Sequence, residues 1–206
     1  MNDRLEDQNM RPEPQVGSDK RVRADAQRNI DTLLQAALEV FASSGVDAPV
    51  REIAEKAGVG IGTLYRHFPQ RSDLVVAVFR HEIDACVKAA SVFAAEYKPF
   101  DALAKWLQRY AAFMATKRGL AAALHSGDPA FDNLPNYFNQ QIKPTCQMLF
   151  DAAVRAGEMR SDVTAADLLS AVANLSSLTY GDDPDRARRM VALLIDGLRY
   201  NANSSE

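Results

Sequence analysis

The sequence predicts an all-helical protein with two parts, an N-terminal unit of three helices that contains a helix-turn-helix and a C-terminal helical bundle. Apolar residues recur at helical spacing through most of the 206 residues, and no segment alternates apolar and polar residues as a strand would. Glycine and proline fall at the ends of the periodic segments, where helices stop. A hydrophobic content of 47% is enough to build a buried core.

The first 20 residues differ from the rest of the chain. They mix Asn, Asp, Gln, Glu and Pro with almost no large apolar residues, a composition that cannot offset the entropy lost on ordering. We therefore expect residues 1–20 to form a disordered arm. A first helix is predicted from Ala24 to the residue before Gly45, because a continuous apolar stripe is formed by Ile30, Leu33, Leu34, Ala37, Leu38 and Phe41.

Two short helices are predicted on either side of a glycine turn. The first covers residues 50–57, with Pro49 suited to its first turn, and it stops at Gly58. The second covers residues 61–68, and Pro69 prevents it from continuing. Together with the first long helix they define a domain over residues 21–70.

Residues 71–206 are predicted to form a second helical domain. Its helices are expected at residues 71–97, 100–116, 117–125, 131–156, 165–179 and 185–200, separated by turn residues. Pro144 is expected to kink or divide its helix near Lys143. Asp183 is placed to cap the last helix, with Pro184 at its first position.

Charge and composition exclude several classes of protein. The chain carries 24 Lys and Arg residues against 27 Asp and Glu residues, and only residues 20–71 are net basic, with eight bases and six acids. No apolar run approaches the roughly 20 residues that cross a bilayer. The first 20 residues lack the apolar core of a secretory signal. We therefore expect a cytoplasmic protein with no membrane contact.

The residues that usually bind metals or form disulfides are sparse. Cys86 and Cys146 lie far apart without a C-x-x-C pair, which favours buried free thiols. The three histidines have no histidine or cysteine partner at helical spacing, so no metal site and no cofactor are predicted.

Two short motifs suggest enzyme chemistry and fail on spacing. The glycines at positions 58, 60 and 62 follow a helix, whereas a dinucleotide-binding loop follows a strand and needs a further glycine that this chain lacks. The run from His125 to Asp128 contains residue types used in nucleophilic catalysis, but as neighbours in one loop they lack an orienting framework. No catalytic residue is predicted.

Residues 50–68 meet the physical demands of a helix-turn-helix. Ala54 and Ala57 permit close helix contact, and Gly58 supplies the turn. Leu64 and Phe68 face the core, which leaves the second helix free to enter a DNA major groove. The exposed residues of that helix are expected to be Gly60, Ile61, Gly62, Thr63, Tyr65, Arg66 and His67.

Each exposed residue type has a use at a DNA surface. Gly60 and Gly62 allow close approach of the backbone, and Arg66 is long enough to donate two hydrogen bonds to guanine. The side chains able to donate to phosphate are Thr63, Tyr65 and His67. The bases that precede the motif, Lys20, Arg21, Arg23 and Arg28, are either a solvated face or a phosphate-contacting arm; beside a helix-turn-helix the second interpretation is favoured.

The run AALEVFASSGVDAPVREIAEKAGVGIGTLYRHFPQRSDL resembles the TetR family of bacterial transcriptional regulators, over about residues 31–74 of this chain. The resemblance implies DNA contacts at Arg51, Gly60, Thr63, Tyr65, His67 and Arg71. Two positions depart from the family pattern: Ala48-Pro49 and Gln70 stand where the family usually has a small polar cap.

The same resemblance implies that the C-terminal domain binds a ligand and forms a dimer. Candidates for lining an apolar pocket are Trp106, Tyr110, Phe113, Met114 and Tyr137, although aromatic residues at helical spacing are also ordinary core residues. Candidates for the dimer interface are Leu168, Val172, Leu175, Met190, Leu194 and Leu198.

The sequence thus favours a homodimeric, ligand-responsive repressor that binds a near-palindromic operator in double-stranded DNA and an unknown small molecule. Two alternatives remain open. One is an activator or a regulator that responds to no ligand, and the other is a helical small-molecule-binding protein or enzyme that carries the helix-turn-helix.

Overall fold

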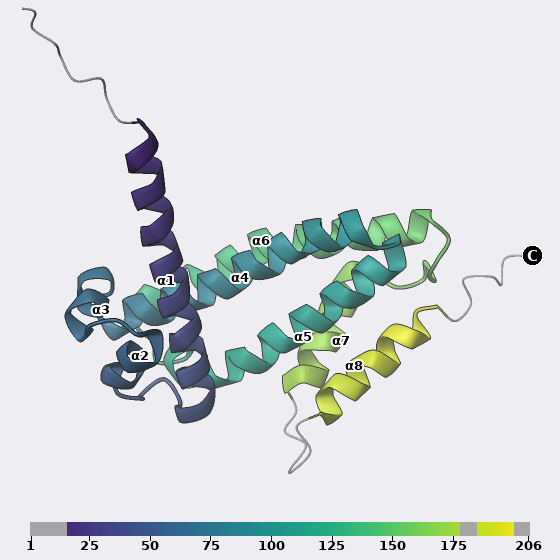
Figure 1. Ribbon diagram of the computed structural model, residues 1–206. Coiled ribbons are helices and arrows are strands. Elements are labelled where there is room, and N and C mark those ends of the chain that lie inside the picture. Colours follow the sequence, from purple (N-terminus) through teal and green to yellow (C-terminus); the bar gives the residue numbers. More distant parts are fainter. Residues whose placement is uncertain (1–15, 178–184, 200–206) are drawn as a thin grey trace, which may run out of the picture.

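The computed structural model describes residues 16–177 and 185–199, with side chains described from residue 26 onward except at 116–119, 121, 122 and 177. Within these ranges the chain forms eight α-helices and one 3-10 helix, and no strand (Figure 1). The predicted all-helical class is confirmed. No described helix is both long and apolar enough to cross a membrane.

The N-terminal domain is built from α1 (Val16–Ser44), α2 (Val50–Ala57) and α3 (Ile61–His67). It forms one end of the molecule, with the first turns of α1 extending beyond it (Figure 1). Because α1 begins at Val16, the expected disordered arm is wrong for residues 16–20; the rest of the arm lies outside the described residues. A helix that is already nucleated extends at low cost, which explains the earlier start.

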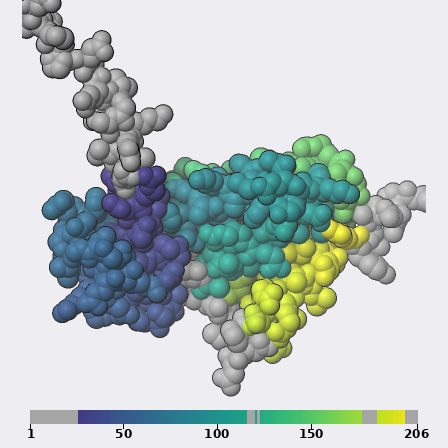
Figure 2. Space-filling view, viewed as in Figure 1, coloured from purple at the N-terminus to yellow at the C-terminus, as the bar shows by residue number. Residues whose placement is uncertain are grey.

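The C-terminal domain contains α4 (Arg71–Glu96), α5 (Pro99–Leu124), η1 (Pro129–Phe131), α6 (Leu134–Arg155), α7 (Ala165–Ser177) and α8 (Arg186–Gly197). Helix α4 packs against α5 and α6, while α7 and α8 pack on α5 (Figure 1). Figure 2 shows α8 on the side of the molecule away from the N-terminal domain.

Three predicted boundaries in this domain are corrected. The two helices predicted at 100–116 and 117–125 are one helix, Pro99–Leu124, because the apolar stripe through Phe113 continues to the buried Leu120, which holds the next turns against the core. Pro144 lies inside α6 without dividing it; Pro144 and Gln140 are both exposed, so water can hydrate the carbonyl that loses its partner. Helix α8 begins after Asp185, and the predicted cap at Asp183 and Pro184 lies outside the described residues.

One hydrophobic core runs through both domains. At its centre the rings of Trp106 and Tyr110 stack 5.7 Å apart, and Phe113 packs against Phe79 and Phe138 at 5.5 and 6.2 Å. The two cysteines are buried free thiols, as predicted. Burial raises the pKa of Cys86 to about 11 and that of Cys146 to about 12, so neither thiol is reactive at neutral pH.

Candidate nucleic-acid interface

The turn between α2 and α3 is fixed by backbone geometry. Gly58 adopts a left-handed conformation, with φ at 68°, that ends α2, and its N–H donates to the carbonyl of Glu55. Gly60 then starts α3 by accepting a hydrogen bond from the N–H of Thr63, at 2.9 Å. Leu64 is buried in the core beside Ile53 and holds α3 against α2. The sequence prediction of this unit is confirmed, with α3 one residue shorter.

The outer face of α3 carries large side chains that the fold does not bury. Ile61 is 45% exposed and Tyr65, one turn later, is 50% exposed. Arg66 and His67 are also exposed, and Thr63 is half-buried. Among the described residues Arg66 has no hydrogen-bond or ion-pair partner. This face can therefore offer a guanidinium and two large apolar surfaces to a partner.

The glycines at positions 60 and 62 have no structural requirement within the chain. A methyl group added at Gly62 would meet no atom within 4 Å, and one added at Gly60 would meet only the hydroxyl of Thr63, at 4.0 Å. Neither residue has the positive φ of Gly58. Gly60 is the N-cap of α3, a position that favours glycine, whereas nothing in the described chain excludes a side chain at Gly62.

Arg51 also lies on the exposed surface, in the first turn of α2. Its Nε donates to the carboxylate of Glu55 at 2.8 Å, and both side chains are well exposed. An exposed ion pair of this kind contributes at most about 1 kcal/mol. The pair can therefore open at low cost for a phosphate.

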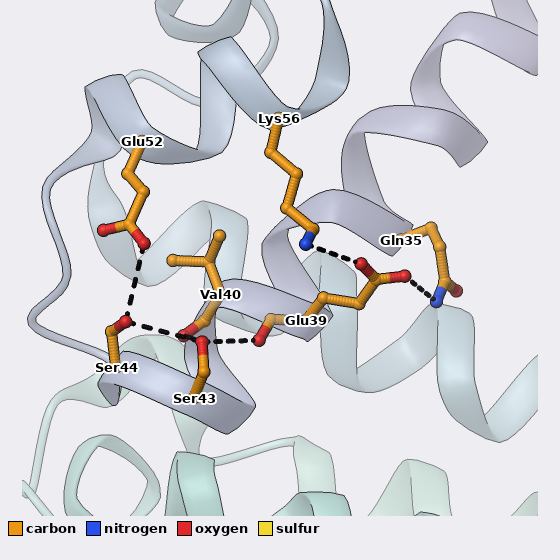
Figure 3. Close-up of polar contacts among 7 residues, drawn as sticks. All are labelled: Gln35, Glu39, Val40, Ser43, Ser44, Glu52 and Lys56. Atoms are coloured by element: carbon orange, nitrogen blue, oxygen red, sulfur yellow. Dashed lines mark hydrogen bonds and ion pairs between the residues drawn. The ribbon is translucent and has the colours of Figure 1, made fainter.

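Polar contacts between α1 and α2 hold α2 in place (Figure 3). The ammonium of Lys56 lies 2.9 Å from the carboxylate of Glu39, which also accepts a hydrogen bond from Gln35. The hydrogen bond from Lys56 lowers the pKa of the Glu39 carboxyl. At the other end of α2, Glu52 accepts from Ser44 at 3.5 Å. Polar contacts thus join both ends of α2 to α1.

Arg71 is placed differently from the other predicted DNA contacts. Its guanidinium is half-buried and donates to the backbone carbonyls of Val46 and of Ala48, the second bond being 2.8 Å long. Both carbonyls belong to the loop that joins α1 to α2. Arg71 therefore ties the start of α4 to the helix-turn-helix, a role that sequence reasoning missed because the partners lie 23 and 25 residues away.

The two departures from the family capping pattern have different outcomes. No side chain caps α2, where Pro49 occupies the N-cap position. At the start of α4 the carboxylate of Asp73 accepts a hydrogen bond from the N–H of Gln70 at 3.0 Å. Asp73 therefore pairs the backbone N–H of Gln70, so the start of α4 is capped although Gln70 departs from the family pattern.

The cavities bounded by described residues are not lined by the predicted ligand-binding residues. Trp106, Tyr110, Phe113 and Met114 are buried in the packed core. Tyr137 lies apart from them at the surface between α4 and α6, where its hydroxyl donates to the carboxylate of Asp84. That hydrogen bond raises the pKa of Tyr137.

A cavity of about 270 Å³ lies next to the buried aromatic residues. It is lined by Phe79, Leu124, His125, Phe131, Leu134, Pro135, Phe138 and Asn139. Phe79 and Phe138, which line it, also pack against Phe113. These lining residues come from four different elements, so no local sequence pattern predicts them.

The predicted dimer residues divide into two groups. Leu168, Val172 and Leu198 are buried within the protomer, so a second copy cannot reach them in this conformation. Leu175, Met190 and Leu194 are half-buried. Sequence reasoning missed Leu193, which is 65% exposed. The apolar face of α8 is wide, so some of its residues pack in the protomer core and others lie at the surface. Periodicity alone does not predict which residue belongs to which group.

The fold and the α2–turn–α3 unit together define a helix-turn-helix DNA-binding protein. Residues 33–78 match the family model of bacterial regulatory proteins of the tetR family. Residues 98–200 match the model of the C-terminal domain of SbtR-like transcriptional regulators. The chain belongs to the TetR family of transcriptional regulators, and the predictions that it binds DNA as a regulator and is not an enzyme are confirmed.

Individual relatives agree with this assignment. The structure of a TetR transcriptional regulator from Streptomyces coelicolor is 36% identical, with a TM-score of 0.71 over 82% of this chain and 97% of that one. A TetR regulatory protein from Mycobacterium vanbaalenii is 34% identical, with a TM-score of 0.68 over 86% and 99%. An HTH-type transcriptional regulator of Staphylococcus aureus is 38% identical over 64 residues, which is 31% of this chain and 35% of that relative's length.

Proposed function

We propose that the protein is a ligand-responsive repressor that binds a near-palindromic operator as a homodimer, with α3 of each protomer in a major groove. The observation that carries this proposal is the outer face of α3. It holds exposed Ile61, Tyr65 and Arg66 beside Gly62, where nothing in the chain excludes a side chain. Direct readout then comes from Arg66, and Thr63, Tyr65 and His67 contribute contacts to phosphate and base.

The test is selection of bound sequences from a randomised duplex pool, repeated at low and high salt. Recovery of two half-sites related by symmetry supports the proposal, and sedimentation of the complex gives the number of protomers. Enrichment of DNA without a shared site would contradict it. Repression is distinguished from activation by placing the recovered operator over a promoter in a reporter and comparing expression with and without the protein.

The proposed dimer uses the exposed face of α8. Leu193 is the most exposed large apolar residue described, and the half-buried Met190 lies one turn before it on the same side of α8, with the half-buried Leu194 one turn after Met190. Together these three residues form an apolar patch, and contiguous apolar patches, unlike single exposed side chains, mark association surfaces. A monomer at micromolar concentration in sedimentation would contradict the dimer.

The proposed effector site is the cavity between α4 and α6. Its apolar lining suits a hydrophobic ligand, and Phe131 of this lining also borders a second cavity of about 420 Å³ at the domain junction. That junction cavity is lined by Val46 and by Arg71, which fixes the loop before α2. A ligand that displaces Phe131 therefore acts on the junction, provided that it binds the two protein states with different affinity.

The role of Arg71 predicts that lysine cannot replace it. Lysine keeps the positive charge but cannot present the guanidinium fork that donates to two carbonyls at once. We expect Arg71→Lys and Arg71→Ala both to weaken binding to all DNA sequences, by about tenfold, measured in gel shifts. Arg155→Lys, an exposed change on α6, is the matched control. Full affinity in Arg71→Lys would show that Arg71 supplies only charge.

Gly62→Ala is expected to stabilise the protein and to weaken its binding to the operator. The added methyl group meets open space, and alanine is favoured over glycine in a helix, so the free energy of unfolding rises by up to about 1 kcal/mol. Operator affinity is expected to fall about tenfold because the methyl group occupies the space that the DNA backbone needs. Denaturant unfolding and gel shifts measure the two quantities on one sample. Unchanged affinity would mean that DNA does not approach α3 at Gly62.

A further inference from the structure

One charged side chain is buried among the residues that the structure describes, and it lies on α4. Glu82 is 6% exposed, whereas the other buried residues of α4 are apolar. The carboxylate of Glu82 accepts a hydrogen bond of 2.9 Å from Nη2 of Arg109 on α5, and the Arg109 side chain is 29% exposed. Moving a charge out of water costs free energy, so the presence of this ion pair in the core needs an explanation.

Stability does not supply that explanation. The attraction within a buried ion pair is largely offset by the hydration that both groups lose, so a well-packed apolar pair of similar size is often as stable or more stable. What the ion pair adds is direction. Its hydrogen bond forms only over a narrow range of distances and angles, and therefore at one relative position of α4 and α5, whereas apolar contacts are non-directional.

The ion pair belongs to a series of contacts that define the register of α4 on α5. One turn later on α4, the carbonyl of Cys86 accepts a hydrogen bond from the indole of Trp106. On the other side of the ion pair, Phe79 packs against Phe113, with 5.5 Å between the ring centroids. Successive contacts move forward along α4 and back along α5, as antiparallel helices require. Of the two directional contacts in this series, the ion pair lies closer to the N-terminal domain.

The same turn of α4 also meets the N-terminal domain. Nδ1 of His81 lies 3.9 Å from the carboxylate of Asp31 on α1, and α1 packs against both α4 and α5. Helix α4 runs from the N-terminal domain along the C-terminal domain, and Arg71 at its start holds the loop before α2 (Figure 1). Arg71 precedes Glu82 by about three turns, or roughly 16 Å. A displacement of α4 at Glu82 therefore also moves the residue that holds this loop.

We propose that Glu82 and Arg109 are a positioning pair, which fixes the N-terminal half of α4 on α5 and so sets the placement of the DNA-binding domain relative to the C-terminal domain. In a dimer, that placement determines the half-site spacing that both recognition helices can reach at once. This consequence for the operator rests on the proposed homodimer, whereas the placement within one protomer does not. The two are therefore measured separately.

The first experiment measures the domain placement directly, in the full chain and without DNA. Glu82→Met with Arg109→Met replaces the ion pair by apolar side chains of similar length and leaves no buried charge unpaired. Spin labels are attached at Ala42→Cys on α1 and Lys143→Cys on α6, both exposed, while the two native thiols are buried. Labelled protein is diluted with unlabelled protein, so the distance within one protomer is measured. We expect a distance distribution broader by on the order of 5 Å, the rise of one helical turn, in the double variant than in the original protein.

The second experiment compares stability and DNA binding in the same double variant. We expect its Tm to equal or exceed that of the original protein, because two buried groups no longer lose their hydration on folding. Its affinity for the selected operator is expected to fall about tenfold, a typical size for coupling between two parts of a protein. Operators whose half-sites are moved apart by one base pair are expected to be discriminated less well, and affinity for unrelated DNA is expected to stay unchanged.

Two further variants serve as controls. Arg109→Lys keeps a positive charge, and one ammonium can replace this contact because it uses a single guanidinium nitrogen. We expect Arg109→Lys to keep operator affinity within about twofold and to keep the label distance. The matched control is Arg160→Met with Asp162→Met, which removes an ion pair within the loop before α7 and is expected to leave both quantities unchanged.

An unchanged label distance in the double variant would overturn the proposal. A lower Tm with unchanged operator affinity and spacing preference would also overturn it, because the ion pair would then serve stability alone. If the original protein selects no paired half-sites, the homodimer proposal fails, and the label distance then decides whether Glu82 and Arg109 position the DNA-binding domain.

Discussion

Replacing Tyr65 and Arg66 together by alanine is expected to abolish operator recognition while leaving the fold intact. Both side chains are exposed, so their removal takes no contact from the core. A two-fold hydrogen-bonded contact from arginine to guanine contributes about 1–3 kcal/mol of discrimination. Two half-sites double that contribution. We therefore expect operator affinity to fall on the order of 10²–10³-fold in gel shifts.

The salt dependence of DNA binding shows whether the double variant has lost sequence recognition or only its attraction to phosphates. Binding to unrelated DNA depends on neutralised phosphates and is expected to fall only severalfold. The matched control is Met148→Ala with Arg155→Ala on α6, because Met148 is 48% exposed, close to the 50% of Tyr65. Arg66→Ala alone is expected to relax the preference at one base position of each half-site. Unchanged operator affinity in the double variant would show that α3 is not the recognition helix.

The N-terminal domain is predictable from the sequence because local residues set its boundaries. Gly58 ends α2 through its positive φ, and Pro69 prevents α3 from continuing. The apolar spacing of Ile53 and Leu64 identifies the buried face. These signals act over a few residues, so the exposed set on α3 follows without knowledge of the rest of the chain.

The tertiary contacts of this domain are not predictable in the same way. The sequence shows that Arg71 stands at the start of a helix, and a basic residue there is expected to contact phosphate. Its hydrogen bonds to the carbonyls of Val46 and Ala48 depend on how α4 meets the loop before α2. The helical spacing of apolar residues does not predict how closely the start of α4 approaches this loop.

The C-terminal domain shows the limit of periodicity more generally. Spacing predicts that Trp106, Tyr110 and Phe113 share one face of a helix, which is correct. It cannot predict whether that face meets a cavity or another helix. The cavity between α4 and α6 is instead lined by residues such as Phe79 and Phe138, from two helices that are far apart in the sequence.

Trp106→Ala is expected to show whether the aromatic residues of α5 line a ligand cavity or belong to the packed core. Trp106 is 0% exposed, its ring stacks on Tyr110, and its indole Nε1 donates to the carbonyl of Cys86 at 3.0 Å. Removing a buried tryptophan leaves a cavity and removes the indole hydrogen bond to Cys86, so the free energy of unfolding is expected to fall by about 3–5 kcal/mol. Because Trp106 is the sole tryptophan, unfolding in urea is followed by far-UV circular dichroism.

The control for Trp106→Ala is Tyr137→Ala, the predicted ligand residue that lies at the surface. Its loss removes the hydrogen bond to Asp84 and a half-buried ring that packs on the core with Arg80 over it, and is expected to cost about 2 kcal/mol, less than Trp106→Ala. Both variants are compared at one protomer concentration, because association changes apparent stability. A Trp106→Ala protein that keeps its stability and loses only the response to an effector would place Trp106 in a ligand cavity. A large loss of stability assigns Trp106 to the core.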